Sequence, residues 1–366
     1  MKKATLNQIH HMYTIVKILD ISVMAFLLLM AFLLPLNISG AVPFAYIANS
    51  GNNTVTVIDT ATNNITSTVN LESHHFPLEV AVTPSGRKVY LTNPIDNSVS
   101  VIYTTEINNP IDVVSIGANP RGIEATSDGK KVYVANSVVF VGARPRGIVI
   151  TPDGRKVYVA NGGDNTVSVI DAKTSKVTDT VNVGVKPRGV TVNPAGTKVY
   201  VVNHGSDNVS VIDIATDKVT ATVNVGQKPY GVVVTPDGKK VYVTNSSKYN
   251  VPGTVSVIDA DASEIVATLK VENKPEEIAA SPDGRKVYVV NFFSQNVSVI
   301  DTATNEVTST VKVGIFSHGI AVDPDGKRVY VTNLLNNNIS AIDTASNTVI
   351  ATIYGGKRPV GIAIAK

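Results

Sequence analysis

Arginine recurs at one position of a short sequence motif that this chain repeats, and we call such a motif a word. The word is Pro-x-Gly, and in three successive copies its middle residue is Arg121, Arg146 or Arg188. Along the whole chain the equivalent positions hold Leu78, Arg121, Arg146, Arg188, Tyr230, Glu276, His318 and Val360. A guanidinium group matches carboxylates and phosphates with paired hydrogen bonds. The arginines therefore favour a site for an anion or an acidic glycan, whereas the alternative is a solvated rim whose Arg stems cover apolar surface.

Carboxylates enter the same stretches of the repeat. Glu79 and Glu277 replace the Gly of Pro-x-Gly, and Glu124 interrupts the apolar run that follows it. A metal or acid–base centre could be built from these groups. Their spacing fits no known ligand pattern, however, and ion pairs to Arg121 would satisfy them equally well. We therefore assign no catalytic or metal-binding residue and expect no cofactor. The candidate ligand-binding residues are Arg121, Arg146, Arg188, Tyr230, Glu276 and His318.

These residues are carried by an internal repeat. Residues 146–187 form four runs rich in β-branched and aromatic residues, with turn signals between them. Pro152 and Gly154 predict a tight turn, because Pro presets φ and Gly accepts positive φ. The next 42 residues, 188–229, repeat this pattern almost word for word. The chain is thus predicted to be an array of four-stranded β-meanders, whose strands we name A to D.

The most regular word of the repeat is Tyr-x-x-Asn, on the second strand of each unit. Its tyrosines are Tyr46, Tyr90, Tyr133, Tyr158, Tyr200, Tyr242, Tyr288 and Tyr330. Because side chains alternate along a strand, Val points to one side and Tyr to the other, so both faces carry large groups. A strand that is apolar on both faces needs a layer on each side. This indicates blades stacked on blades.

Taken together, these words resemble those of the YVTN-repeat β-propellers. That family is known from surface-layer and surface-antigen proteins of methanogenic archaea and from some bacterial exported proteins. Literal Tyr-Val-Thr-Asn stands at 242–245 and 330–333, and Val-Ser-Val-Ile-Asp stands at 167–171, 209–213, 255–259 and 297–301. The resemblance extends from Tyr46 to the C-terminus. It implies an exported binding or scaffold module, although propellers as a fold host many activities.

The two ends of the array predict a closed ring. The first unit begins at a B strand (residues 44–49) and lacks strand A, whereas residues 360–365 are an A strand with no B strand after it. We expect the C-terminal strand to complete the first blade. Closure also removes exposed sheet edges at the two ends.

One unit of the repeat is short. Tyr158 follows Tyr133 after 25 residues instead of 42, and aligning 140–147 with 182–189 shows that 17 residues are missing, which removes strand C and most of strand D. We expect eight A strands, seven complete four-stranded antiparallel blades and a two-stranded half-blade at the third position. The alternative is a seven-bladed ring in which residues 121–141 pack irregularly.

Alternating strand direction sorts the loops onto two faces. The A–B and C–D turns share one face and are short and uniform. The B–C loops and D–A connections share the other face, where the sequence varies, as in residues 161–165, 203–208 and 245–252. Variable loops on a rigid scaffold usually carry function. We expect the site on this face, around the central channel.

Residues 1–41 do not belong to the array. Lys2, Lys3 and Lys17 precede an apolar run over residues 21–36, and residues 39–41 offer small side chains for cleavage. We predict a signal peptide over 1–41 and one propeller domain over 42–366; the alternative is an N-terminal membrane anchor. In either case the propeller is expected to be extracellular or at the cell surface. Its expected partner is a cell-envelope glycan or a surface protein.

Composition narrows the classes of function. Without residues 1–41 the chain has 29 basic and 28 acidic residues. Its net charge is therefore close to zero and provides no overall positive electrostatic field that would attract nucleic acid. It has no cysteine, and no phosphate loop, nucleophile elbow or HExxH word. His204, alone in a loop, is interpreted as solvated. The second candidate function is an exported lactonase- or lyase-like enzyme with its site at the channel mouth. We favour a binding scaffold because the possible catalytic residues occur separately and do not make up a complete catalytic site.

Overall fold

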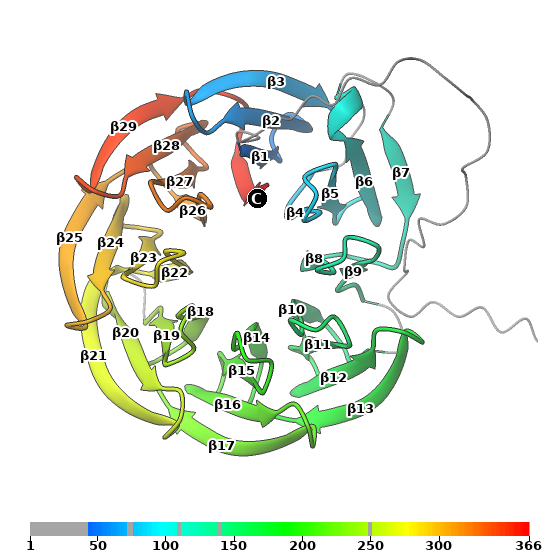
Figure 1. Ribbon diagram of the computed structural model, residues 1–366, viewed down its shortest axis with the longest axis vertical. Helices are drawn as coiled ribbons and strands as arrows, with labels where there is room; N and C mark the ends of the chain where they lie inside the picture. Colours follow the sequence, from blue (N-terminus) through cyan, green and yellow to red (C-terminus); the bar gives the residue numbers. More distant parts are fainter. Residues whose placement is uncertain (1–42, 72–75, 108–110, 138–140, 248–250, 366) are drawn as a thin grey trace, which may run out of the picture.

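The chain forms a ring of antiparallel sheets around a central channel (Figure 1). This computed structural model describes residues 43–71, 76–107, 111–137, 141–247 and 251–365. Seven sheets have four strands and one has two. The 3-10 helix η1 (Thr104–Glu106) is the one helical segment of the described residues, none of which form a helix long and apolar enough to cross a membrane. The predicted signal segment lies outside these residues.

Each blade contributes its first strand to the channel and its last to the outer rim. The A strands are β4 (Val80–Val82), β8 (Ile123–Ala125), β10 (Pro145–Ile150), β14 (Pro187–Val192), β18 (Pro229–Val234), β22 (Pro275–Ala280), β26 (Ser317–Val322) and β30 (Pro359–Ile364). The B strands are β1 (Phe44–Asn49), β5 (Lys88–Asn93), β9 (Val132–Val134), β11 (Lys156–Asn161), β15 (Lys198–Asn203), β19 (Lys240–Asn245), β23 (Lys286–Asn291) and β27 (Arg328–Asn333).

The outer half of each complete blade holds the C and D strands. The C strands are β2 (Thr54–Asp59), β6 (Ser98–Tyr103), β12 (Thr166–Asp171), β16 (Asn208–Asp213), β20 (Pro252–Asp259), β24 (Asn296–Asp301) and β28 (Asn338–Asp343). The D strands are β3 (Asn64–Asn70), β7 (Asp112–Ser115), β13 (Lys176–Asn182), β17 (Lys218–Asn224), β21 (Glu264–Asn273), β25 (Glu306–Lys312) and β29 (Thr348–Ile353). We number the blades 1 to 8 along the chain, with the half-blade third.

The predicted closure and the predicted half-blade are both confirmed. Strand β30 pairs antiparallel with β1, with Ile362 opposite Ile47, so the C-terminal strand completes blade 1. Strands β8 and β9 form a regular antiparallel pair, with Ile123 opposite Val134, and this sheet has no third strand among the described residues. The alternative of irregular packing between residues 121 and 141 is therefore wrong for the part that the structure describes.

The core lies between neighbouring blades, and the repeated Tyr is its largest member. All eight of these tyrosines are at most 2% exposed. Tyr200 of blade 5, for example, packs against Val241, Val243 and Ile258 of blade 6. Each such aromatic side chain removes a large apolar area from water, which makes the contact between blades the main source of stability.

The polar ends of the B strands hold the next blade. Tyr158 Oη donates to Asp217 Oδ1 at 2.6 Å, and Lys156 Nζ lies 2.6 Å from Asp217 Oδ2. Asp217 belongs to the C–D turn of the following blade. Tyr330 closes the ring in the same way by donating to Asn63 Oδ1 of blade 1 at 2.7 Å. We call this contact of a B strand with the next C–D turn the clasp.

The Asn of the repeated word has a separate task within its own blade. Asn203 Nδ2 donates to Asn208 Oδ1 at 2.8 Å and to Ser210 Oγ at 2.9 Å, both on strand C. Every complete blade has a pair of this kind. Among the described residues the half-blade has no strand C, and the buried Nδ2 of Asn136 has no hydrogen-bond partner there.

Close approach of the A strands explains the Gly of Pro-x-Gly. A Cβ atom at Gly147 would lie 2.4 Å from the carbonyl oxygen of Arg188, and one at Gly189 would lie 2.7 Å from that of Tyr230. Interior packing leaves no room for such an atom. The ring is therefore tightest at this level, directly beside the residues that line the channel mouth.

Candidate functional site

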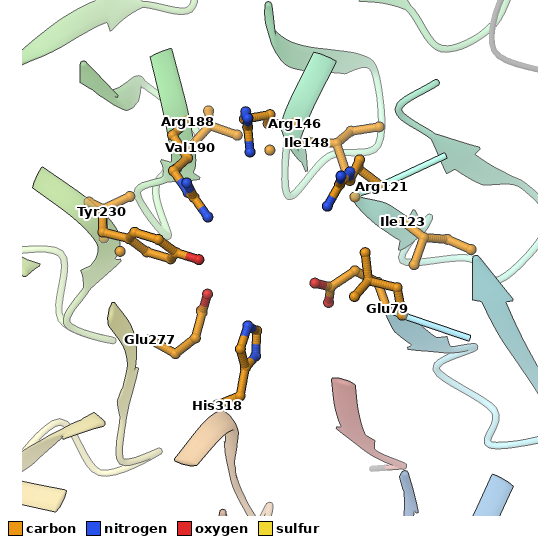
Figure 2. A pocket seen from close by; sticks show the side chains of 16 residues that line it. Glu79, Arg121, Ile123, Arg146, Ile148, Arg188, Val190, Tyr230, Glu277 and His318 are labelled. Carbon is orange, nitrogen blue, oxygen red and sulfur yellow. The ribbon is translucent and has the colours of Figure 1, made fainter. Parts of the chain in front are cut away.

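A cavity of about 320 Å³ occupies the channel at the end that carries the B–C loops and D–A connections. Figure 2 shows the side chains that point into it. Three arginines and a tyrosine lie along one side, and two glutamates and a histidine complete the circle. These polar residues are Arg121, Arg146, Arg188, Tyr230, Glu277, His318 and Glu79.

The A strands deliver these side chains because each strand starts at the cavity. Arg146, Arg188 and Tyr230 are the second residues of β10, β14 and β18, directly after the Pro that opens each strand. Arg121 stands two residues before β8, in the half-blade. Since the next residue is Gly in all four units, no side chain separates one of these groups from its neighbour. Successive units therefore place them side by side.

The arginine side of the cavity concentrates positive charge. Burial and the neighbouring Arg188 and Arg121 charges lower the pKa of Arg146. The guanidinium carbon of Arg188 lies 3.6 Å from the ring centre of Tyr230, a cation–π contact that holds both side chains in place. Among the residues that the structure describes, no ion pair or hydrogen bond joins these three guanidinium groups to a carboxylate. They are available to an anion.

The glutamates in the cavity occupy the two positions where Gly of the word is replaced. Burial raises the pKa of Glu79 to about 8; the charge of Glu277 adds to the rise, and Arg121 and Arg188 oppose it. Burial also raises the pKa of Glu277, against the opposing effect of His318. At neutral pH Glu79 is therefore mainly a protonated acid that can donate a hydrogen bond.

Glu276 does not join the other candidates, contrary to the sequence-based expectation. It is 5% exposed and does not line the cavity. Its Oε1 lies 3.1 Å from Lys274 Nζ. That ammonium group lies over the rings of Phe292 and Phe293, at 4.7 and 4.6 Å from their centres. The ion pair beside these aromatic rings holds Glu276 away from the channel, and the next residue, Glu277, enters instead.

Glu124 lies in a different cavity from Glu79. That second cavity, of about 380 Å³, is also lined by Val82, Ile150 and Ile364, from the later parts of the A strands. Burial raises the pKa of Glu124 to about 8, although its Oε2 accepts a hydrogen bond from Ile150 N at 3.1 Å. Within the described ranges no group of three His, Cys, Asp or Glu could hold a metal ion. The two carboxylates therefore do not form one centre.

His204 is more enclosed than its loop position suggested. Its Nδ1 lies 3.0 Å from the carbonyl oxygen of Pro229 in the next blade. Burial lowers its pKa, and the nearby charges of Arg188 and Lys228 lower it further. The interpretation of His204 as a solvated loop residue is therefore wrong. It is half-buried and joins its loop to the start of β18.

A closed ring of antiparallel blades around a lined channel defines a β-propeller. The family model described as YNCE-like beta-propeller matches residues 130–238. Together with the ring and the repeated words, this match supports a β-propeller of the YVTN-repeat type. No curated protein matches the sequence.

Solved structures share the fold at low identity. Hydrazine synthase from Kuenenia stuttgartiensis is 18% identical, with a TM-score of 0.58 over 80% of this chain and 90% of that one. The dihydro-heme d1 dehydrogenase NirN is 15% identical, with a TM-score of 0.73 over 87% and 74%. A functionally unknown protein from Desulfotomaculum acetoxidans is 16% identical, with a TM-score of 0.64 over 88% and 98%. At these identities the likeness shows the propeller fold alone.

Proposed function

We propose that this chain is an exported β-propeller that binds an anionic ligand at the channel mouth, namely an acidic glycan of the cell envelope. The observation that carries the proposal is the meeting of Arg121, Arg146 and Arg188 in one cavity, with no carboxylate bonded to any of them among the described residues. Guanidinium groups recognise carboxylates through paired, charge-assisted hydrogen bonds. The ligand is a partner outside the cell or at its surface.

The electrostatics of the cavity support an anion rather than a neutral ligand. Burial is the main cause of the lowered pKa of Arg146, and the charges of Arg188 and Arg121 lower it further, so these three positive charges repel one another. A bound carboxylate would relieve this repulsion. The concave cavity would also concentrate the field of the three charges, although the chain as a whole is nearly neutral.

The test is a comparison of the triple variant Arg121→Ala/Arg146→Ala/Arg188→Ala with Arg155→Ala. Arg155 lies in the A–B turn of blade 4, away from the cavity. Its substitution is the control for loss of an exposed arginine outside the proposed site. Calorimetric titration with an acidic polysaccharide should show weaker binding for the triple variant by more than the ~0–1 kcal/mol of an exposed ion pair. Binding to the unaltered chain should fall with added salt. Equal affinity of the two variants would reject the proposal.

Export follows from the predicted signal segment. If cleavage occurs after Ala41, the chain recovered from its native host begins at Val42. Intact-mass measurement decides this, since a mass that includes residues 1–41 would indicate a retained membrane anchor.

A second candidate function is a lactonase- or lyase-like reaction at the same cavity. One observation favours it, which is that the carboxyl group of Glu79, next to Arg121 in the cavity, has a pKa raised to about 8. Such a group could act as a general acid or base near neutral pH. Turnover of a lactone or an acidic polysaccharide that disappears in Glu79→Gln would establish it. Binding without turnover would leave the scaffold function alone.

A further inference from the structure

The cavity at the channel mouth is a well with two levels. The upper level carries the charged groups, such as Arg121, Arg146 and Arg188. The lower level carries Ile123, Ile148, Val190 and Val232, each two residues further along its chain segment. Because each A strand starts at the mouth, these apolar residues lie further along the channel than the charged ones. The well therefore has a charged rim and an apolar wall.

The rim differs from one side to the other. Arginines supply the charge on one side, Glu79 lies next to Arg121, and Glu277 and His318 lie across the opening (Figure 2). A ligand that fills the well would meet cations on one edge and carboxyl groups on its other edges. Burial keeps Glu79 protonated at neutral pH, so it can donate a hydrogen bond to a hydroxyl or a ring oxygen.

One chemical group combines these requirements. A sugar acid has a carboxylate on one edge of a six-membered ring, hydroxyl groups on the other edges, and C–H groups on its faces. We propose that the well binds one terminal sugar-acid residue of a glycan end-on. Its carboxylate would lie at the arginine side, its hydroxyl groups at Glu79 and Glu277, and a ring face against Ile148 or Val190. This inference rests on the proposed function.

End-on binding follows from the shape of the well. The A strands surround it on all sides, so a polymer cannot run sideways below the rim (Figure 1). Its volume, about 320 Å³, lies at the small end of the roughly 300–1,000 Å³ typical of ligand sites. That is room for one sugar ring and little more. A polymer that lies across the mouth could therefore place at most one of its sugar rings among the A strands, and the direct way to do so is with a terminal residue.

The test uses the full chain and four soluble probes in calorimetric titrations. They are glucuronate, glucose, acetate and a polyglucuronate of about ten residues. Glucuronate should bind at least about tenfold more tightly than glucose, which lacks the carboxylate, and than acetate, which lacks the ring. If binding is end-on, each ten-residue polymer should bind one protein molecule at each terminus that the well recognises. Its affinity should be close to that of a short oligomer with the same terminus.

A variant that fills the well sharpens the test. Ile148→Phe places a larger side chain below the rim and leaves the arginines in place. It should lose at least about tenfold in affinity for glucuronate. Arg155→Ala, at the opposite face, is the matched control and should bind as the unaltered chain does. The stoichiometry of the polymer needs no variant, so poor folding of Ile148→Phe would not spoil the experiment.

Two kinds of failure remain distinct. If the polymer binds in an arginine- and salt-dependent way but with several proteins along one chain, or if acetate binds as tightly as glucuronate, end-on binding of a sugar acid is wrong and anion binding stands. If no acidic probe binds and the triple arginine variant behaves as the unaltered chain, both the inference and the proposed function are rejected.

Discussion

Complete blades and the half-blade carry the same words on their B strands, but in the part of the chain that the structure describes the half-blade lacks the C strand and the C–D turn that these words contact elsewhere in the ring. In blade 4, Lys156 and Tyr158 meet the C–D turn of blade 5 at Asp217. In blade 2, Tyr90 has no such hydrogen bond within the described residues, because the next unit has no C–D turn. Lys88 Nζ lies instead over the ring of Tyr103, at 4.7 Å.

The comparison shows that each B strand contains side chains that need a contact partner elsewhere, either on strand C of the same blade or in the C–D turn of the next blade. The half-blade is 17 residues shorter than a complete unit and lacks the contact partners of the blade 2 B strand and of Asn136. The side chains that would make these contacts are still present. The ring still closes because the lost strands are a pair, which leaves the chain on the same face. The inner strands, which line the channel, are retained. The half-blade therefore still contributes Arg121 to the cavity.

The largest expected difference between the two regions lies in the asparagines. Asn203→Ala should lower the free energy of unfolding by about 2 kcal/mol, because two buried hydrogen bonds to strand C are lost, although its buried Oδ1 has no partner among the described residues. Asn136→Ala should cost about zero or stabilise the chain, since its Nδ2 is buried without a partner. Urea unfolding of the two variants measures the difference. A similar cost at both positions would mean that Asn136 is bonded in solution.

The tyrosine hydroxyl groups should show a smaller difference. Tyr158→Phe loses a 2.6 Å hydrogen bond to the Asp217 carboxylate and should cost about 1.5 kcal/mol. Tyr90→Phe loses no such bond and should change stability by about 0.5 kcal/mol or less. Thermal unfolding of both variants is sufficient. The clasp would lose its assigned role if Tyr158→Phe proved as harmless as Tyr90→Phe.

A third difference depends on pH. Burial raises the pKa of Glu124 in the half-blade from 4.5 to about 8. The raised value contributes stability that is complete below about pH 4.5 and is lost as the pH rises through about 8. Glu124→Gln should therefore become steadily more stable relative to the unaltered chain as the pH rises from 5 to 8.5. Glu272→Gln, on the exposed strand β21, is the control. A constant difference across this range would contradict the burial of a charge at Glu124.

The smallest effect concerns local opening of the sheets. Strand β9 is buried, with exposure of at most 3%, but has no third strand beside it among the described residues. We expect amides of residues 131–136 to exchange with solvent roughly tenfold faster than those of 156–161 or 240–245. Hydrogen exchange read by mass spectrometry compares the three segments in one experiment. Equal protection would indicate that another segment or a partner pairs with β9.

Periodicity in the sequence was sufficient for the fold. Tyr-x-x-Asn marks the B strand of every unit, and the interval of 25 residues between Tyr133 and Tyr158 located the half-blade. The split first blade predicted ring closure. These features follow from sequence because a strand within a repeat has the same neighbours in every unit, so local pattern and tertiary contact agree. For the same reason, the arginines at equivalent positions could be expected in one sector of the mouth.

For residues that break the repeat, the direction in which the side chain points could be learned only from the tertiary structure. Of the six candidate residues, five line the cavity, whereas Glu276 turns to Lys274. Glu277 and Glu79 enter the cavity, and Glu124 lies in a second cavity, where it bonds to Ile150. Where such a side chain points depends on which charge and which free space adjoin it across the blade interface, and no local pattern encodes that. The sequence by itself determined where each strand lies, and the packing of neighbouring blades decided which carboxylates face the arginines.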